Sequence, residues 1–144
     1  MDKKMTQIFR HEFTVGKDAL DEIGHVNNVV YVQWMQDVAT LHSDTAGCTA
    51  ATKSAGAVWV VRSHRIEYLR PAFGGDHVAA LTWVENFRRV TSLRKYTFVR
   101  MSDDTVLAKG ETDWVFVDAR SGRPRIIPQD VIGAFWALAG DHRR

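Results

Sequence analysis

The sequence predicts an α+β protein in which a single antiparallel sheet wraps around one long buried helix. Three observations support this class: a helix-periodic apolar stripe near the N-terminus, four long β-rich segments after it, and short joins between those segments. Strands that are separated from helices along the chain favour a sheet that packs its apolar face on the helix. The 144 residues fit one domain, residues 1–144, which is large enough to bury a core.

The first part of the chain predicts a strand, a loop and the long helix. Residues 6–15 are typical of a strand, and residues 16–26 contain the turn residues of a polar loop. The helix is expected to begin at Asn27 or Asn28, because asparagine is a strong N-cap, and to end before Gly47, which suits the position after a helix. Its apolar stripe at helical spacing consists of Val30, Tyr31, Trp34, Met35, Val38, Ala39 and Leu41.

The second part of the chain predicts four strands and a short terminal helix. The strands are expected at residues 57–70, 76–86, 91–101 and 104–117, and the joins PAFGG, NFRRV and MSDD are short enough for antiparallel hairpins. Residues 128–140 open with Pro128 at a plausible first helical position and carry apolar residues at helical spacing. A five-stranded sheet in one layer leaves an outer face and an edge, so we expect a homo-oligomer, a dimer or a tetramer.

Composition excludes several classes of protein. The one cysteine, Cys48, cannot form an internal disulfide or a thiolate zinc site, which favours a reducing, cytoplasmic compartment. The apolar runs are shorter than the ~20 residues that a membrane span needs, and the first residues lack the apolar region of a secretory signal. The net charge of +2 is too small for a nucleic-acid footprint. We therefore expect neither a membrane nor a nucleic acid as a partner.

Short motifs for other chemistries are absent from the sequence. It has no dinucleotide-binding or phosphate-binding glycine loop, no zinc-protease motif, no nucleophile elbow and no C-x-x-C pair. The histidines show no metal-ligand spacing with carboxylates, so we expect no metal and no cofactor. A Cys-His nucleophile at Cys48 is disfavoured because no histidine stands at a sequence spacing that would indicate a catalytic pair with it. Basic residues form three groups, each either a solvated face or a site for the phosphates of a small molecule. The groups are Arg62, Arg65 and Arg70; Arg88, Arg89, Arg94 and Lys95; and Arg120, Arg123 and Arg125.

Residues 20–34, LDEIGHVNNVVYVQW, place a carboxylate, a Gly-His pair and two asparagines before the apolar helix. The pattern D-x-x-G-H-V-N-N-x-x-Y-x-x-W resembles the signature of hot-dog-fold acyl-CoA thioesterases, the 4-hydroxybenzoyl-CoA thioesterase superfamily, and also the acyl-carrier-protein thioesterases of plants. IEYLRPAFGGD, LAKGETDWVFVDARSGRP and IIP resemble the later strands of that family, so the resemblance covers nearly the whole chain. It implies a hot-dog fold and hydrolysis of an acyl-CoA substrate without a cofactor.

The loop before the helix has the groups that thioester hydrolysis needs. The reaction requires a nucleophile or base and a site for the negative charge that develops on the carbonyl oxygen. The beginning of a helix offers free N–H groups and the positive end of the helix dipole. The resemblance places the oxyanion site there, with the backbone N–H of Asn28 as the matching donor. Asp21 would then attack the acyl carbon, giving a mixed anhydride, or activate a water molecule.

The other motif residues have structural as well as functional interpretations. His25 either fixes the loop or takes the direct part that the histidine of the plant enzymes suggests. Asn27 and Asn28 are expected to cap the helix and brace the loop, and their side chains could orient the acid or a water molecule. Tyr31 and Trp34 match the motif, but their helical spacing favours the core or the wall of a substrate pocket.

The sequence departs from its relatives at two positions. Many of them carry a second aspartate where this chain has Ala19, and the plant enzymes carry an asparagine where it has Ile23. The case for catalysis therefore depends mainly on Asp21. A further acid, Glu67, is expected to form an ion pair with an arginine rather than to face the site.

Substrate-binding candidates outside the motif lie in the second hairpin. Arg88 and Arg89 stand at its tip, where they are either solvated turn residues or bind the phosphates of coenzyme A across a subunit boundary. The acyl group would lie beside the apolar helix. Two alternatives to an acyl-CoA thioesterase stay open: an acyl-carrier-protein thioesterase, and a non-catalytic hot-dog protein that binds an acyl thioester.

Overall fold

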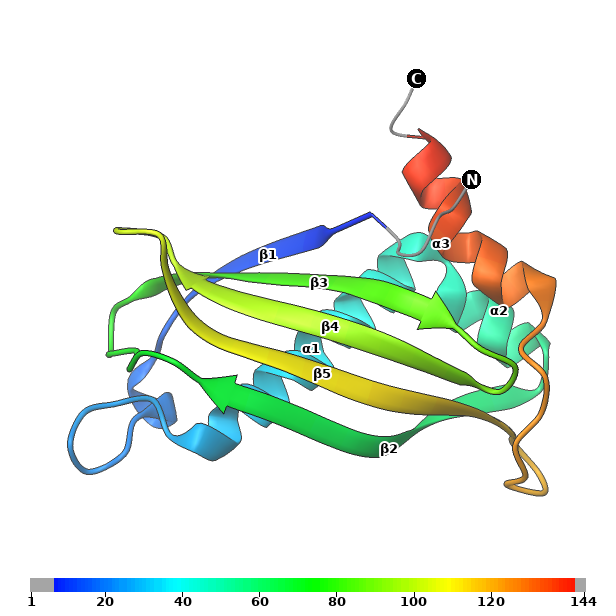
Figure 1. Cartoon of the computed structure of the whole chain (residues 1–144), viewed down its shortest axis with the longest axis horizontal. Helices are drawn as coiled ribbons and strands as arrows, with labels where there is room; N and C mark the ends of the chain where they lie inside the picture. The colour runs from blue at the N-terminus through cyan, green and yellow to red at the C-terminus, as the bar shows by residue number, and fades with distance from the viewer. Residues whose placement is uncertain (1–6, 142–144) are drawn as a thin grey trace.

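The computed structural model describes residues 7–141, with side chains up to residue 135. One strongly curved sheet covers one side of a long helix, and two shorter helices lie at the far end of that helix (Figure 1). The elements in chain order are β1 (Phe9–Thr14), the 3-10 turn η1 (Lys17–Ala19), α1 (Asn28–Ala46), α2 (Cys48–Ser54), β2 (Ala57–Tyr68), β3 (His77–Phe87), β4 (Thr91–Arg100), β5 (Thr105–Asp118) and α3 (Gln129–Asp141).

The predicted α+β architecture is confirmed. The five strands lie in the order β1-β3-β4-β5-β2, and every neighbouring pair is antiparallel. Strands β3, β4 and β5 form consecutive hairpins, as the joins NFRRV and MSDD predict, whereas β1 and β2 form the two edges. The hairpin expected at the join PAFGG is wrong, because β2 pairs with β5 and β3 pairs with β1, so this join crosses from one edge of the sheet to the other side. Apart from the start of the first strand, the predicted strand ends agree to within two residues, the usual uncertainty of such boundaries. The first strand was expected from residue 6, which lies outside the described residues, but it begins at Phe9.

The helix α1 begins and ends where the sequence predicts. Asn27 is its N-cap, and Gly47 follows it in the left-handed conformation with φ 89°. The side of α1 that faces the sheet packs on apolar residues that alternate along the strands, such as Val78, Ala80 and Phe98, all at most 1% exposed. This main core surrounds the first half of α1.

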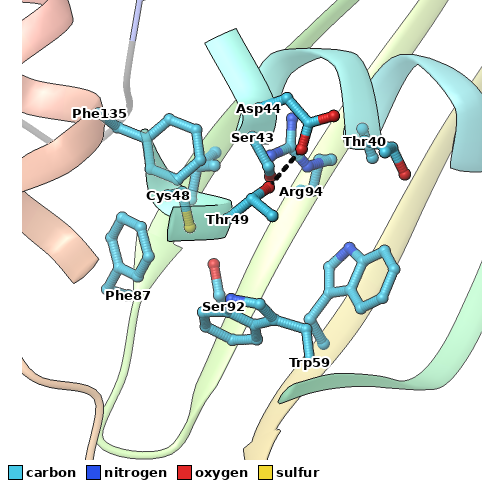
Figure 2. Close-up of a pocket in the computed structure, with 13 residues that line it drawn as sticks. Thr40, Ser43, Asp44, Cys48, Thr49, Trp59, Phe87, Ser92, Arg94 and Phe135 are labelled. Atoms are coloured by element: carbon cyan, nitrogen blue, oxygen red, sulfur yellow. Dashed lines mark hydrogen bonds between the residues drawn. The ribbon is translucent and has the colours of Figure 1, made fainter. Parts of the chain in front are cut away.

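A second apolar cluster joins the end of α1 to α2, α3 and the β3–β4 hairpin. Beside it lies a cavity of ≈ 320 Å³, here called the Arg94 cavity (Figure 2). Its lining residues are Ala39, Thr40, Ser43, Asp44, Cys48, Thr49, Trp59, Val84, Phe87, Ser92, Arg94, Trp114 and Phe135.

Two local predictions are corrected by the structure. The sequence analysis did not predict α2, whose seven residues are too few to show a helical period. Pro128 was expected at the first helical position of the terminal helix, but it precedes α3, and its carbonyl accepts hydrogen bonds from the N–H groups of Val131 and Ile132.

Within residues 7–141 no helix combines the length and the apolar character that crossing a membrane would require.

The apolar stripe of α1 was predicted to end with Leu41, but the buried residue is His42. Leu41 is 39% exposed and His42 is 2% exposed. Arg94 donates a hydrogen bond of 2.8 Å from Nη1 to Nδ1 of His42. Because a guanidinium only donates, Nδ1 must accept, so the imidazole is neutral and carries its proton on Nε2. The ring also stacks on Phe9 and meets Phe135 edge-on.

The buried His42 predicts a pH dependence of stability. Burial lowers the pKa of His42 from 6.5 to about 3, and the charge of Arg94 acts in the same direction. The stability that the neutral ring contributes is therefore complete above the unfolded-state pKa and is lost as the pH falls towards 3. Between pH 6.5 and 5 we expect the free energy of unfolding to fall by about 1 to 2 kcal/mol on this account.

The measurement is urea unfolding across that pH range at constant ionic strength. A His42→Asn variant keeps a side-chain oxygen that can accept from Arg94 but cannot be protonated. It should lose most of this dependence, and equal slopes for the two proteins would contradict the interpretation.

The helix lies close to the sheet over Gly110 of β5. A Cβ atom at this position would lie 2.9 Å from the Met35 Sδ atom and 3.3 Å from the Arg65 carbonyl oxygen. Met35 itself is 0% exposed. The absence of a side chain at residue 110 therefore lets α1 lie directly on the middle of the sheet.

Candidate active site

The loop before α1 is a tight turn closed by Asp21. Its Oδ1 atom accepts hydrogen bonds from the backbone N–H groups of Ile23 and His25, both at 3.0 Å. Its own N–H donates to the His25 carbonyl at 2.7 Å, and its carbonyl accepts from Gly24 at 3.1 Å. Gly24 has φ 81°, a conformation that glycine adopts without strain. Asp21 thus holds its turn rigid through its side chain and its backbone, as short acidic residues often do.

The turn is attached to a second loop that connects β2 to β3. Val26 donates a backbone hydrogen bond of 2.8 Å to the carbonyl of Ala72, and His25 forms an isolated antiparallel bridge with Phe73. The imidazole of His25 meets the Phe73 ring edge-on, with 5.1 Å between the ring centroids. These contacts support the interpretation in which His25 fixes the loop.

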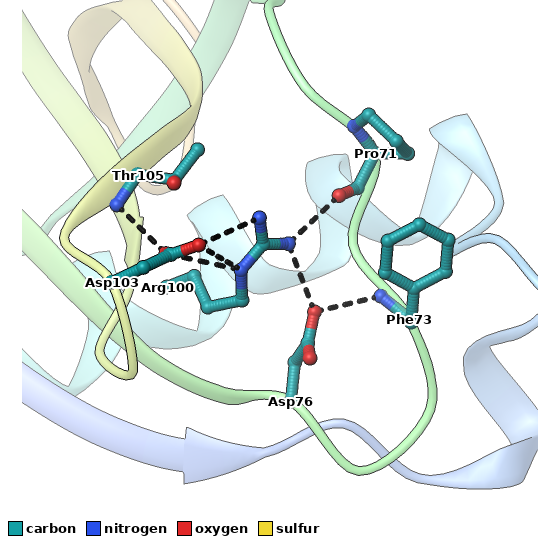
Figure 3. A network of polar contacts seen from close by, with 6 residues as sticks. All are labelled: Pro71, Phe73, Asp76, Arg100, Asp103 and Thr105. Carbon is teal, nitrogen blue, oxygen red and sulfur yellow. Dashed lines mark hydrogen bonds and ion pairs between the residues drawn. The ribbon is translucent and has the colours of Figure 1, made fainter.

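An arginine-centred network fixes the second loop in turn (Figure 3). Arg100, at the end of β4, donates from Nη1 to the carbonyl of Pro71 at 3.1 Å and to Oδ2 of Asp76 at 3.3 Å. Its Nε atom donates to Asp103 at 3.2 Å. The same Oδ2 atom of Asp76 accepts from the N–H of Phe73 at 2.9 Å. The loop that carries His25 therefore rests on a segment that is tied to the sheet.

The amides that open α1 are only partly satisfied. Asn27 accepts from the N–H of Val29 with its side chain at 3.1 Å, and from that of Val30 with its carbonyl at 3.0 Å. The N–H of Asn28 has no acceptor within residues 7–141. It is the first amide of the helix, at the positive end of the helix dipole, and so can donate to an oxygen that gains negative charge.

The structure brings Asp21, His25, Asn27 and Asn28 to one end of α1. The turn also joins that end by a bridge between Leu20 and Val26. Asp21 is exposed, and the hydrogen bonds of its carboxylate to described residues stay within its own turn. Its predicted contact with the amides of α1 therefore depends on a substrate or a water molecule that lies between them.

Aromatic residues form the wall beneath the start of the helix. Tyr31 is 3% exposed, and its ring lies 4.8 Å from that of Trp34 and 5.5 Å from those of Tyr68 and Phe98. Burial raises the pKa of Tyr31 to about 12, so its hydroxyl stays protonated. Tyr68 donates a hydrogen bond of 3.0 Å to the carbonyl of Asn28. Tyr31 and Trp34 thus belong to the core, and their contact with a substrate stays a prediction.

Arg88 and Arg89 lie at the other end of the molecule. Both are exposed at the tip of the β3–β4 hairpin, next to α2 and α3, whereas the Asp21 turn lies at the opposite end of the sheet (Figure 1). One chain therefore does not bring them together with Asp21. Arg94 had been grouped with them as a solvated or phosphate-binding residue; the solvated interpretation is wrong, because Arg94 is 4% exposed and lines a cavity beside α1.

Two alternative sites receive no support from the geometry. Cys48 is 2% exposed, and burial raises the pKa of its thiol, which disfavours the reactive thiolate. Glu67 was expected to pair with an arginine, but it stands opposite Lys109 in the sheet, and no arginine of the described side chains lies at ion-pair distance. In the described part of the chain, no three histidine, cysteine or acidic residues gather as they would around a metal ion.

Residues 15–135 match the thioesterase-like superfamily. The chain belongs to this superfamily. The resemblance that the sequence carries is thereby confirmed, together with the hot-dog fold. None of the curated proteins that were compared with the chain matches it.

Solved structures share the fold at low sequence identity. YbaW from Escherichia coli, described as a probable thioesterase, is 15% identical with a TM-score of 0.82, over 90% of this chain and 98% of that one. Slr0204 from Synechocystis, a 1,4-dihydroxy-2-naphthoyl-CoA thioesterase, is 16% identical with a TM-score of 0.81, over 92% and 98%. SAV2348 from Staphylococcus aureus, solved in complex with CoA, is 14% identical with a TM-score of 0.82, over 97% and 89%.

Sequence reasoning missed the residues that hold this superfamily member's loop in place. Asp76 ends the stretch IEYLRPAFGGD but was given no role, Arg100 lies in no motif, and their pairing joins segments 24 residues apart. Tyr68 lies in the same stretch and was given no role either. Each of these side chains acts through a contact between distant segments, and a single sequence gives no signal for such contacts.

Proposed function

We propose that this protein hydrolyses an acyl-CoA thioester to CoA and a free carboxylic acid. The observation that carries the proposal is the open N–H of Asn28 at the same end of α1 as the Asp21 turn. Membership of the thioesterase-like superfamily supports it. So do Slr0204, which is named as an acyl-CoA thioesterase, and SAV2348, which was solved with CoA.

The proposed reaction assigns the positive helix end to the thioester carbonyl. The N–H of Asn28 donates to the carbonyl oxygen and stabilises the charge that develops as the tetrahedral intermediate forms. Asp21 either attacks the acyl carbon, giving a mixed anhydride that water then hydrolyses, or takes a proton from the water that attacks. In both routes the C–S bond breaks, CoA leaves as a thiol, and water supplies the hydroxyl of the acid.

We also propose that the active form is a homo-oligomer, a dimer or a tetramer, in the cytoplasm. The edge strand β2 has 12 residues, and on it Val58 and Val60 are 45% and 46% exposed. A long unpaired edge with exposed apolar residues favours pairing with a second chain. Because Arg88 and Arg89 lie far from Asp21 within one chain, they can bind the phosphates of the same CoA only across a subunit boundary. Light scattering gives the mass in solution.

The test of the reaction is release of free thiol from short, long, branched and aryl acyl-CoAs, followed with a thiol-reactive dye. We expect turnover of at least one of them. The same acyl group on an acyl-carrier protein distinguishes the carrier, since faster turnover there would favour the acyl-carrier-protein thioesterase. Binding of acyl-CoA without turnover of any substrate would instead indicate a non-catalytic acyl-thioester-binding protein.

A further inference from the structure

The Arg94 cavity contains a buried positive charge that no described acid neutralises. Arg94 is 4% exposed, and no carboxylate of the described side chains lies at ion-pair distance from it. Its Nη1 atom makes both of its hydrogen bonds, to His42 at 2.8 Å and to Thr82 at 3.1 Å. Its other contact is with the face of the Phe135 ring, 5.6 Å from the centroid.

The partners of this guanidinium are all neutral. His42 carries no charge because it accepts from Arg94, and Thr82 donates its own proton to the Lys95 carbonyl at 2.9 Å. The Nε and Nη2 atoms of Arg94 make no hydrogen bond to described residues. Burial of a charge without an ion partner is strongly unfavourable, so the arrangement favours an anion that reaches the free side of the guanidinium.

The rest of the cavity determines what kind of anion fits. Trp59, Trp114, Phe87 and Phe135 give it aromatic walls, and Figure 2 shows several of these rings around the labelled polar residues. The volume of ≈ 320 Å³ lies at the lower end of the range of about 300–1,000 Å³ for small-molecule sites. Such walls exclude a fully hydrated ion and accept an apolar ring or a branched chain.

One acidic residue limits the charge of the ligand. Asp44 lines the cavity, and its Oδ1 atom accepts a hydrogen bond from the Thr49 hydroxyl rather than an ion pair from Arg94. A phosphate dianion would be repelled by this carboxylate and would leave part of its charge without a partner. A monocarboxylate presents one charge and two oxygens, which match the fork of a guanidinium.

We propose that the Arg94 cavity binds a small aromatic or branched monocarboxylate, whose carboxylate pairs with Arg94 and whose apolar body lies among the tryptophan and phenylalanine rings. This site is separate from the Asp21 turn, because the residues of α1 that line the cavity lie between Ala39 and Asp44, near the end of the helix, whereas the turn precedes its start at Asn28. The proposal goes beyond thioester hydrolysis and does not depend on it, since binding at this end requires no group of the candidate active site.

The test is calorimetric titration of the full chain with 2-naphthoate, with its neutral isostere 2-naphthamide as the matched ligand and inorganic phosphate as a probe for the charge alone. We expect 2-naphthoate to bind with one site per chain and to quench tryptophan fluorescence, because Trp59 and Trp114 line the cavity. The amide should bind at least about tenfold more weakly, as expected for the loss of a charge-assisted hydrogen-bonded pair, and phosphate should not bind.

Three variants locate the site. Arg94→Met keeps the volume of the side chain and should reduce 2-naphthoate affinity to that of the amide. Ser43→Leu fills the cavity from α1 without touching the charge, should abolish binding of both ligands, and decides the question if Arg94→Met does not fold. Asp21→Asn should leave binding unchanged. Equal affinity for acid and amide, tight binding of phosphate, or binding that survives Ser43→Leu would each overturn the proposal.

Discussion

Replacing Asp21 with asparagine is expected to lower kcat for acyl-CoA hydrolysis by about 10²–10⁴-fold while the fold stays intact. Asparagine keeps an oxygen in the Oδ1 position, so the hydrogen bonds from the N–H groups of Ile23 and His25 can persist and the turn should keep its shape. It removes the negative charge that a nucleophile or base requires. The measurement is thiol release at saturating substrate, together with the midpoint of thermal unfolding.

Two further variants separate chemistry from loop geometry. Asp18→Asn removes an exposed acid in the neighbouring turn η1 and should leave kcat unchanged. Asp21→Ala removes the charge and also the acceptor of the two N–H groups, so it should lower both kcat and stability. If Asp21→Asn turns over at the rate of the unmodified protein, the acid has no chemical role and its function is to brace the turn.

Replacing Phe98 with alanine is expected to lower the free energy of unfolding by about 3–5 kcal/mol. Phe98 is 0% exposed and lies at the centre of the aromatic wall, with its ring 5.5 Å from that of Tyr31 and 5.9 Å from that of Trp34. Removal of the ring leaves a cavity under α1. Tyr31 and Trp34 could fill it only by giving up their contacts with other residues. Urea unfolding at neutral pH measures the change.

The matched control is Phe73→Ala, which removes the same atoms from a side chain that is 41% exposed. Its loss of apolar burial is smaller, so we expect a decrease of no more than about 1.5 kcal/mol. Similar losses for the two variants would show that the ring of Phe98 is not as closely packed as the structure indicates. Because Phe73 contacts His25, its variant also tests whether that contact matters for turnover.

The sequence was sufficient for most of the fold because its local signals agree. Asn27 and Gly47 mark the two ends of α1, and the alternation of Val78, Ala80, Thr82 and Val84 shows the buried side of β3. Prediction from the sequence failed where the residue type suggests exposure but the side chain is buried in the folded protein. A histidine and an arginine are usually exposed, so the burial of His42 and Arg94, which depends on their contact with each other, could not be foreseen.

Only the part of the candidate site that lies in one continuous segment could be predicted from the sequence. Residues 21–34 form a motif, and the structure places its polar members together at the start of α1. The arrangement that holds this segment comes from Ala72, Phe73 and Arg100, which belong to a different loop and a different strand. Whether Arg88 and Arg89 belong to the site depends on a second chain.

The bare backbone at Gly110 limits how this protein can move. Met35 packs closely on the backbone at Gly110, so sliding or rotation of the helix over the sheet would require Met35 to give up this contact. Helix and sheet should therefore behave as one rigid frame. Under the proposed function we expect room for the acyl chain to come from displacement of the two connecting segments, residues 16–27 and 69–76. Substitutions there should then alter rates of ligand exchange more than the equilibrium shape of the frame.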